Sequence, residues 1–313
     1  MIETGLEASV AFRCFGGTAA VWLAGEGDVD GELAEIRREL EGWHRRFTRF
    51  ESASELSQLN ADPAGTVRVS DLMCRFVAAA VDAARRTDGL VDPTLVAEIE
   101  AAGYAGDRPR SMAPYAGLEA APPRRPARPN PHSRWREISA DRRLGTVTRP
   151  RGVQLDSGGI AKGLFADLVA KQLALFDAFA VDCGGDLRVG GRGARPRTVC
   201  VDDPGGGCLH EFQVVSGGIA TSGIGRRAWL SASGRPVHHL LDPGTGQPAF
   251  TGIVQATALA PTAVEAEALA KAALLSGPGG ARNWLPHGGL IVFDDGSHAV
   301  VEPSKVATAP ARR

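Results

Sequence analysis

The sequence predicts an α+β protein in which mixed or antiparallel sheets are flanked by helices. Short apolar runs closed by glycine or proline fill the second half of the chain, which is typical of strands joined by tight turns. No regular alternation of strand and helix accompanies them, which argues against a doubly wound parallel sheet. Apolar residues at helical spacing are confined to a few segments, and helices are expected near residues 29–50, 71–87, 160–173 and 262–275.

The first half begins with one expected strand over "AFRCFGGTAAVWLAG", from Ala11 to Gly25. A helix should follow, because apolar residues recur on one helical face at Leu33, Ile36, Leu40 and Trp43. The helix over 71–87 is expected to open with Ser70 as its cap and to end before Gly89.

Residues 108–131 interrupt this pattern with seven of the chain's twenty prolines and many arginines. This composition predicts an extended or disordered surface insertion within the domain. A basic arm for nucleic acid is the alternative, but the core "PPRRPARPNP" lacks the aromatic residues on which bases stack.

The second half is expected to begin with a hairpin in "RWREISADRRLGTVTRP" that turns at Leu144 and Gly145. The helix over 262–275 should be capped by Gly277, and "GGLIVFDDGSHAVVEP" should close the fold as a hairpin across Asp295 and Gly296. Further strands are expected in "AFAVDCGGDLRVGG", "RTVCVDD", "HEFQVVSGGIATSG" and "HHLLDPGTGQPA".

Charge and cysteine content limit the class of protein. With 35 Lys plus Arg against 36 Asp plus Glu, the net charge of −1 gives no electrostatic case for nucleic acid or an anionic membrane. No window approaches the about 18 apolar residues of a membrane span, and the first residues resemble no signal peptide. Five cysteines without C-x-x-C spacing are typical of a reducing compartment. We therefore expect a cytoplasmic protein.

The stretch "VQLDSGGIAKGLFADLVAKQL", from Val153 to Leu173, runs from an apolar strand through a glycine turn into a helix. Its spacing fits neither a P-loop nor a dinucleotide-binding fingerprint. Paired glycines, a helix N-terminus and Lys162 nevertheless favour an anion. A tight turn with a solvated lysine remains the alternative.

Four glycine-punctuated motifs recur in order: "LDSGGIAKG", "VDCGGDLRVGG", "GGIATSG" and "HHLLDPGTGQP", followed by the helix "APTAVEAEALAKAALLSG". In the first half, "GGT", "SELSQLN" and "DGLVDPT" add to the set. Together they resemble the ApbE family of FAD:protein FMN transferases over most of the chain outside the insertion. The resemblance implies one ApbE-like domain over residues 1–313, built of two intertwined subdomains.

The resemblance also implies a reaction. Family members cleave FAD between its phosphates, attach FMN through a phosphoester to a threonine or serine of an acceptor flavoprotein, and release AMP. The pyrophosphate of FAD would lie over Gly158, Gly159 and Lys162, with His239 and Lys162 as the catalytic residues. The implied FAD-binding residues are Thr18, Glu55, Asn60, Asp92, Gly158, Gly159, Lys162, Thr221, Ser222 and His239.

Several of these residues also have simpler interpretations. Glu55 and Asn60 alone would indicate a capping pair on a short surface helix, and Asp92 a turn. Asp156 could orient the glycine loop or help to hold a cation, and it could equally cap the helix. A lone histidine such as His239 is usually structural.

The metal site departs from the family pattern. The resemblance implies Mg²⁺ bound by a loop carbonyl, at Ala161, and by an aspartate and a threonine at i and i+4 of the last helix. This chain has Glu267 and Lys271 at the two helical positions. An ammonium is no ligand for Mg²⁺, so Mg²⁺ binding is in doubt. Gly16, Ile224 and Gly225 also replace family residues.

A binding or interaction module without flavin is one alternative. Two flavin-dependent functions follow from the sequence: an FAD:protein FMN transferase with a remodelled metal site, or a catalytically weakened FAD-binding protein or FAD pyrophosphatase of the same fold. Either function requires the loop over 158–163, the helix over 262–275 and His239 to face one pocket.

Overall fold

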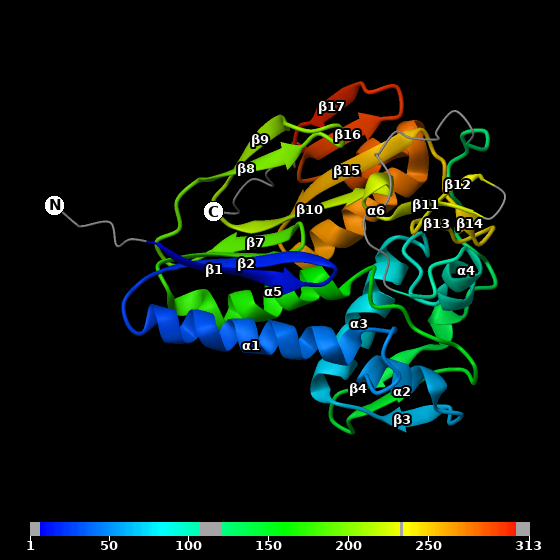
Figure 1. Cartoon of the computed structure of the whole chain (residues 1–313), viewed down its shortest axis with the longest axis horizontal. Coiled ribbons are helices and arrows are strands. Elements are labelled where there is room, and N and C mark those ends of the chain that lie inside the picture. Colours follow the sequence, from blue (N-terminus) through cyan, green and yellow to red (C-terminus); the bar gives the residue numbers. More distant parts are fainter. Residues whose placement is uncertain (1–6, 107–120, 232–233, 305–313) are drawn as a thin grey trace, which may run out of the picture.

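A computed structural model describes residues 7–106, 121–231 and 234–304 of the 313-residue chain. Its centre is an eight-stranded sheet in the order β1-β2-β6-β7-β10-β15-β16-β17 (Figure 1). Every neighbouring pair in this sheet is antiparallel. The α+β class is therefore confirmed. The strands are Ala8–Cys14, Gly17–Ala24, Ala178–Cys183, Asp186–Gly190, Gly217–Gly223, Ile253–Ala260, Gly289–Phe293 and His298–Val301.

Three helices pack against one face of this sheet. Helix α1 contacts β1 and β2, α5 contacts β6 and β7, and α6 contacts β10 and β15. The hairpin of β8 and β9 packs on the other face, where Val214 joins Ala180 and Val189 in a small apolar cluster (Figure 1). The α-helices are α1 (Val29–Phe47), α2 (Glu55–Ala61), α3 (Asp71–Arg86), α4 (Val96–Ala101), α5 (Ala161–Gln172) and α6 (Ala263–Gly280).

The remaining strands form small sheets at the periphery. β5 (Thr146–Thr148) lies between β3 (Thr66–Arg68) and β4 (Ser139–Asp141). Three two-stranded sheets pair β8 (Arg197–Asp202) with β9 (Cys208–Val214), β11 (Ala228–Leu230) with β12 (Pro236–His238), and β13 (Leu241–Asp242) with β14 (Gln247–Pro248). Single 3-10 turns span Arg134–Glu137, Leu173–Leu175, Ile224–Arg226 and Ala281–Trp284.

Local capping explains where the main helices begin and end. The Ser70 hydroxyl accepts a hydrogen bond from the Met73 N–H at 3.1 Å, as predicted for the start of α3. Thr262 caps α6 in the same way. Gly277 has a φ of 69°, which interrupts α6 at the predicted cap, although the helix continues to Gly280. The hairpins predicted at Gly145 and at Asp295 and Gly296 are confirmed as β4–β5 and β16–β17.

The single strand expected from Ala11 to Gly25 is wrong. This segment contributes to two strands, β1 and β2, which pair around a tight turn. Phe15 and Gly16 adopt φ angles of 55° and 70° there, in the left-handed region that a two-residue hairpin turn requires. Glycine provides this conformation readily, so Gly16 marks a turn where a continuous strand was expected.

The prediction of a surface insertion over the proline- and arginine-rich residues 108–131 needs correction in part. Residues 107–120 lie outside the described part of the chain, but residues 121–131 make contacts with the core of the fold. The Arg125 N–H donates to the Phe250 carbonyl at 2.9 Å, and the Ala127 N–H donates to the Leu275 carbonyl at 2.8 Å. Ala127 is buried in the apolar cluster beneath α6. This stretch is extended, as predicted, but it is attached to the core.

Cysteine pairing also differs from the expectation of a reducing compartment. Cys200 and Cys208 form a disulfide across the β8–β9 hairpin, which brings their Cα atoms to 5.8 Å. Cys14, Cys74 and Cys183 are buried thiols, and burial raises the pKa of each. Within the described residues, no helix has the length and apolar character needed to cross a membrane. The cytoplasmic location stays a prediction.

Candidate active site

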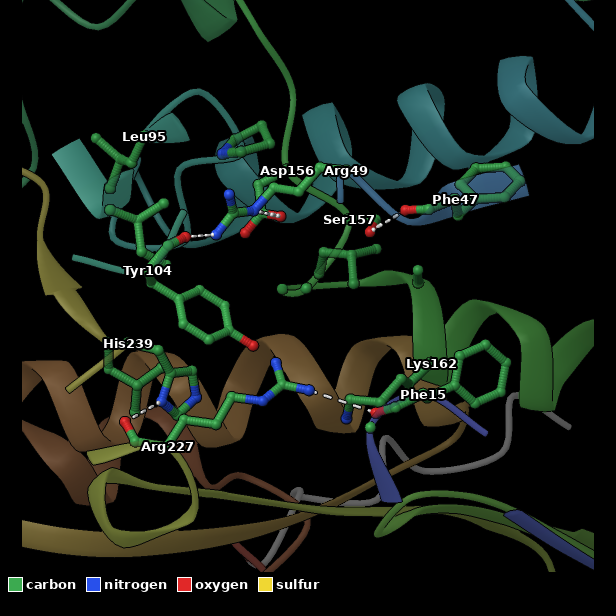
Figure 2. Close-up of a pocket in the computed structure, with 18 of the residues that line it drawn as sticks. Phe15, Phe47, Arg49, Leu95, Tyr104, Asp156, Ser157, Lys162, Arg227 and His239 are labelled. Atoms are coloured by element: carbon green, nitrogen blue, oxygen red, sulfur yellow. Dashed lines mark hydrogen bonds and ion pairs between the residues drawn. The ribbon is translucent and has the colours of Figure 1, made fainter. Parts of the chain in front are cut away.

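A cavity of about 290 Å³ lies where the glycine loop before α5 meets α6 (Figure 2). Gly158, Gly159 and Lys162 line it from one side, and Lys271 lines it from α6. His239 opens into the same space. The predicted convergence of the loop, the 262–275 helix and His239 is therefore confirmed. Other lining segments are residues 15–16, 47–51, 90–93 and 239–241.

The glycine loop is held in place by hydrogen bonds at its ends. The Ser157 hydroxyl donates to the Phe47 carbonyl at 2.7 Å, and the Ser157 carbonyl accepts from the Ala161 N–H at 3.0 Å. Helix α5 begins at Ala161 and has no side-chain cap. Its N-terminus, with a partial positive charge, therefore lies beside the cavity. The N–H groups of Ala161 and Gly163 are already used, because they donate to the Ser157 carbonyl and to Glu267 Oε2.

Asp156 lines the cavity and does not cap α5. Its carboxylate lies 3.6 Å from the Arg49 Nε, and its N–H donates to the Pro93 carbonyl at 2.9 Å. Of the interpretations that the sequence left open, orientation of the loop agrees with these contacts.

Four charged side chains meet at the inner wall of the cavity: Lys162, Asp186, Glu267 and Lys271, here called the charge cluster. The Lys162 ammonium pairs with Asp186 and lies 3.5 Å from Glu267 Oε1. Glu267 Oε1 also accepts from Lys271 Nζ at 3.0 Å, while Glu267 Oε2 accepts from the Gly163 N–H at 2.9 Å. Asp186, Glu267 and Lys271 are buried, and Lys162 is half-buried.

The two carboxylates of the charge cluster differ in acidity. Burial, together with the negative charge of Glu267, raises the pKa of Asp186 to about 7. Burial acts in the same direction on Glu267, but the ammoniums of Lys271 and Lys162 hold its pKa at about 2. Glu267 is therefore ionised at neutral pH. Sequence analysis did not single out Asp186, although it is the acidic residue of "GGDLR".

His239 is half-buried, and its environment keeps it neutral. Burial lowers the pKa of its imidazole well below 6.5, and the nearby charge of Arg227 adds to this effect. Its Nδ1 lies 3.4 Å from the Arg227 carbonyl. Because a carbonyl only accepts hydrogen bonds, this contact assigns the proton to Nδ1 and leaves a lone pair on Nε2. The Nε2 lone pair is therefore available at neutral pH.

Arg49, Tyr104 and Arg227 also line the cavity, and sequence analysis missed all three. The guanidinium carbons of Arg49 and Arg227 lie 5.0 and 5.6 Å from the centre of the Tyr104 ring (Figure 2). Arg227 Nη2 donates to the Phe15 carbonyl at 3.3 Å. A Cβ on Gly16 would lie 2.7 Å from the same nitrogen, so glycine at this position leaves room for Arg227. No local motif brings these distant residues together.

Asp92 lines the cavity, but its carboxylate also shapes a turn. Oδ1 accepts from the Thr94 N–H at 2.8 Å and from the Thr94 hydroxyl at 2.6 Å. Oδ2 accepts from the Ser133 hydroxyl. Asp92 therefore has the turn function that its position before Pro93 indicates, at the edge of the candidate site.

Five of the candidate FAD-binding residues lie outside the cavity lining: Thr18, Glu55, Asn60, Thr221 and Ser222. Glu55 accepts from the N–H of Ser70 at 2.8 Å and pairs with Arg46 at 2.6 Å, so it stabilises the start of α3. Both ends of the Asn60 amide bond the backbone of Leu155, at 2.8 and 2.9 Å.

The other three positions lie in strands of the main sheet. The Thr221 hydroxyl is 2.8 Å from that of Thr257, Ser222 is buried in β10, and Thr18 is exposed on β2. Glu55, Asn60 and Thr221 therefore make hydrogen bonds within the fold. Asn60 acts on the site indirectly, because it holds the backbone of Leu155, which lies just before the glycine loop.

The residues at the expected metal position do not fit Mg²⁺. This ion requires near-octahedral oxygen ligands at about 2.0–2.1 Å. Both oxygens of Glu267 already accept hydrogen bonds from nitrogen, and the Lys271 ammonium stands where a hydroxyl is expected. Repulsion between a divalent ion and an ammonium 4 Å away amounts to about 8 kcal/mol at an effective dielectric constant of 20. Across the described residues, no group of three or more His, Cys, Asp or Glu could hold a metal.

Comparison with known proteins places this site in a family. The sequence model of the ApbE family matches residues 10–293. The chain belongs to the ApbE family. A crystal structure of the ApbE protein from Thermotoga maritima superposes with a TM-score of 0.78 at 26% identity, covering 95% of this chain and 97% of that one. The apo flavinyl transferase ApbE of Pseudomonas stutzeri gives 0.74 at 22% identity, with 96% of each chain covered. The ApbE-like fold is therefore confirmed.

Curated ApbE relatives are FAD:protein FMN transferases. The Rhodobacter capsulatus protein is 28% identical over 87% of this chain, and the Haemophilus influenzae protein is 23% identical over 83%. The Treponema pallidum protein is 34% identical, over 40% of this chain. The matched regions cover 52% of the Rhodobacter protein, 78% of the Haemophilus protein and 39% of the Treponema protein.

Proposed function

We propose that this chain is an FAD:protein FMN transferase. A threonine or serine hydroxyl of an acceptor flavoprotein attacks the phosphorus of the FMN half of FAD. The bond between that phosphorus and the bridging oxygen breaks, a phosphoester forms, and AMP leaves with the bridging oxygen. One observation carries the proposal: in a member of the ApbE family, a helix N-terminus, Lys162 and a neutral histidine face the same cavity.

The glycine loop and Lys162 are suited to the diphosphate. Gly158 and Gly159 allow the ligand to approach the backbone, and the N-terminus of α5 favours an anion. Lys162 adds a full charge to this partial one. Arg227 brings a further cation to the cavity, and its guanidinium contacts a neutral carbonyl, which leaves its charge available to a phosphate.

His239 is suited to act as the general base. Its Nε2 lone pair can take the proton of the acceptor hydroxyl as the new phosphoester bond forms. Because burial holds the imidazole neutral, it is ready for this step at neutral pH. The proton then passes from the imidazolium to AMP or to water, and His239 is restored.

A second candidate function is a weakened FAD-binding protein or FAD pyrophosphatase. The charge cluster favours it, because the carboxylates of Glu267 and Asp186 offset part of the charge of the two lysines. Less net positive charge then remains to stabilise the transition state. With water as the acceptor, the same bond cleavage would release FMN and AMP.

The decisive experiment incubates the purified protein with FAD and an acceptor domain that carries a threonine- or serine-containing flavinylation segment. We expect a fluorescent acceptor band that survives denaturing electrophoresis, and one equivalent of AMP for each flavin attached. An acceptor whose target hydroxyl is replaced by alanine is the control. Release of FMN and AMP without labelling would support the pyrophosphatase, and no FAD turnover or binding would refute both functions.

A further inference from the structure

The charge cluster places a fixed ammonium at the cavity wall, opposite the glycine loop. Lys271 lines the cavity, yet only 11% of its side-chain surface is exposed. Its Nζ is held by Glu267 Oε1 at 3.0 Å, and Glu267 is itself anchored to α5 through the Gly163 N–H. A lysine on a solvated helix face loses entropy when it binds a ligand, but this one is already ordered.

An ammonium carries three donors, and Glu267 Oε1 accepts one of them. The other N–H groups of Lys271 can donate to an anion in the cavity. Because Lys162 and Lys271 both contact the Glu267 carboxylate, the same anion can also contact Lys162. Within the described residues, this arrangement brings together two ammoniums and a helix N-terminus. That combination suits a diphosphate better than a single phosphate.

We propose that Lys271 replaces a divalent metal ion in this protein, so that the diphosphate of FAD binds between Lys162 and Lys271 without Mg²⁺. This inference rests on the proposed function, because FAD is its ligand. The charge cluster has no set of oxygen ligands free for a metal, and its second ammonium supplies a positive charge on the side of the cavity where a metal is expected.

The charge supplied in this way is smaller than that of a metal ion. One ammonium carries a single positive charge, and the charge cluster as a whole holds two cations and two carboxylates. FAD binding should therefore depend on directed hydrogen bonds more than on long-range attraction. Loss of one charge-assisted hydrogen bond lowers affinity by about 10–100-fold.

Calorimetric titration of FAD into the wild-type protein, in EDTA and in excess Mg²⁺, provides the first test. We expect dissociation constants within about threefold of each other. A tenfold or greater loss of affinity in EDTA would overturn the inference. This comparison needs no variant, so it stands whether or not substitutions in the cluster fold.

Lys271→Met provides the second test, because methionine keeps an unbranched chain without the charge. We expect FAD affinity to fall about 10–100-fold in EDTA, with riboflavin affinity unchanged, because riboflavin carries no phosphate. Lys171→Met is the matched control: Lys171 is exposed on α5 and lies outside the cavity lining, so FAD affinity should stay the same. Equal FAD affinity in Lys271→Met and wild type would overturn the inference.

The acceptor-labelling assay separates this inference from the proposed function. Labelling together with FAD binding that needs Mg²⁺ would leave the transferase function intact and refute the role of Lys271. Tight FAD binding in EDTA without labelling in any buffer would support the role of Lys271 and refute the transferase function.

Discussion

Gly163 is the point where α5 and α6 touch, and Gly163→Ala should therefore disturb both stability and activity. A Cβ at this position would lie 2.6 Å from the Ala263 carbonyl oxygen and 2.7 Å from the Val264 Cα. Ordinary van der Waals contact begins at 3.4 Å, so the two helix backbones would have to separate by about 0.8 Å. Backbone atoms cannot rotate away as a flexible side chain can.

The helices are also joined by hydrogen bonds that such a movement would lengthen. The Asp167 carboxylate accepts from the N–H groups of Ala263 and Val264, each at 2.9 Å, and Glu267 accepts from Gly163 itself. Overpacking of this kind costs about 1–3 kcal/mol in free energy of unfolding. A displacement near 1 Å at a catalytic site can lower the rate by about 100-fold, and α5 and α6 carry Lys162 and Lys271.

Urea denaturation measures the first effect, and the rate of acceptor labelling measures the second. We expect a lower urea midpoint at unchanged slope. Gly42→Ala in α1 is the matched control, because its Cβ would meet nothing within 4 Å. This control should raise stability by about 0.5–1 kcal/mol through reduced backbone entropy of the unfolded chain. A Gly163→Ala protein as stable and as active as wild type would refute the close approach of the two helices.

Three further predictions follow from the same contacts. Lys162→Met should weaken FAD binding more than riboflavin binding in calorimetry, because the proposed ligand of Lys162 is the diphosphate, which riboflavin lacks; equal losses would mean that Lys162 does not bind phosphate. Asn60→Ala should lower the free energy of unfolding by about 1–3 kcal/mol, because it leaves the Leu155 N–H and carbonyl without partners; a drop in FAD affinity without a shift of the urea midpoint would instead indicate direct contact. Burial lowers the pKa of His238 from 6.5 to about 4. As pH decreases, the unfolded chain therefore binds a proton at His238 before the folded protein does. The free energy of unfolding should fall by up to about 1.4 kcal/mol per pH unit between pH 6.5 and pH 4. Urea midpoints at pH 7 and pH 5 should be closer together in His238→Asn, and an unchanged difference would contradict a native-state pKa near 4.

Capping and turn residues, together with the glycine motifs, were predictable because their physical causes are local. Ser70 and Thr262 cap the helices expected from the sequence, since a short hydroxyl side chain reaches the N–H groups one turn ahead. The closing hairpin around Asp295 and Gly296 follows from turn chemistry in the same way. The β1–β2 hairpin was missed because a single left-handed turn at Phe15 and Gly16 interrupts an otherwise continuous apolar run.

Tertiary structure alone decided that Glu267 and Lys271 are buried and that Lys162 and Asp186 join this pair. In the sequence, Glu267 and Lys271 could equally form an exposed ion pair of little consequence, and Asp186 has no visible partner. Close approach of α5 to α6 at Gly163 buries Glu267 and brings Lys162 to it. The same applies to Arg49 and Arg227, whose guanidinium groups both come to lie near the Tyr104 ring only after distant loops have folded together. Electrostatic pairing depends on distance and burial, and neither of these is encoded in any local stretch of residues.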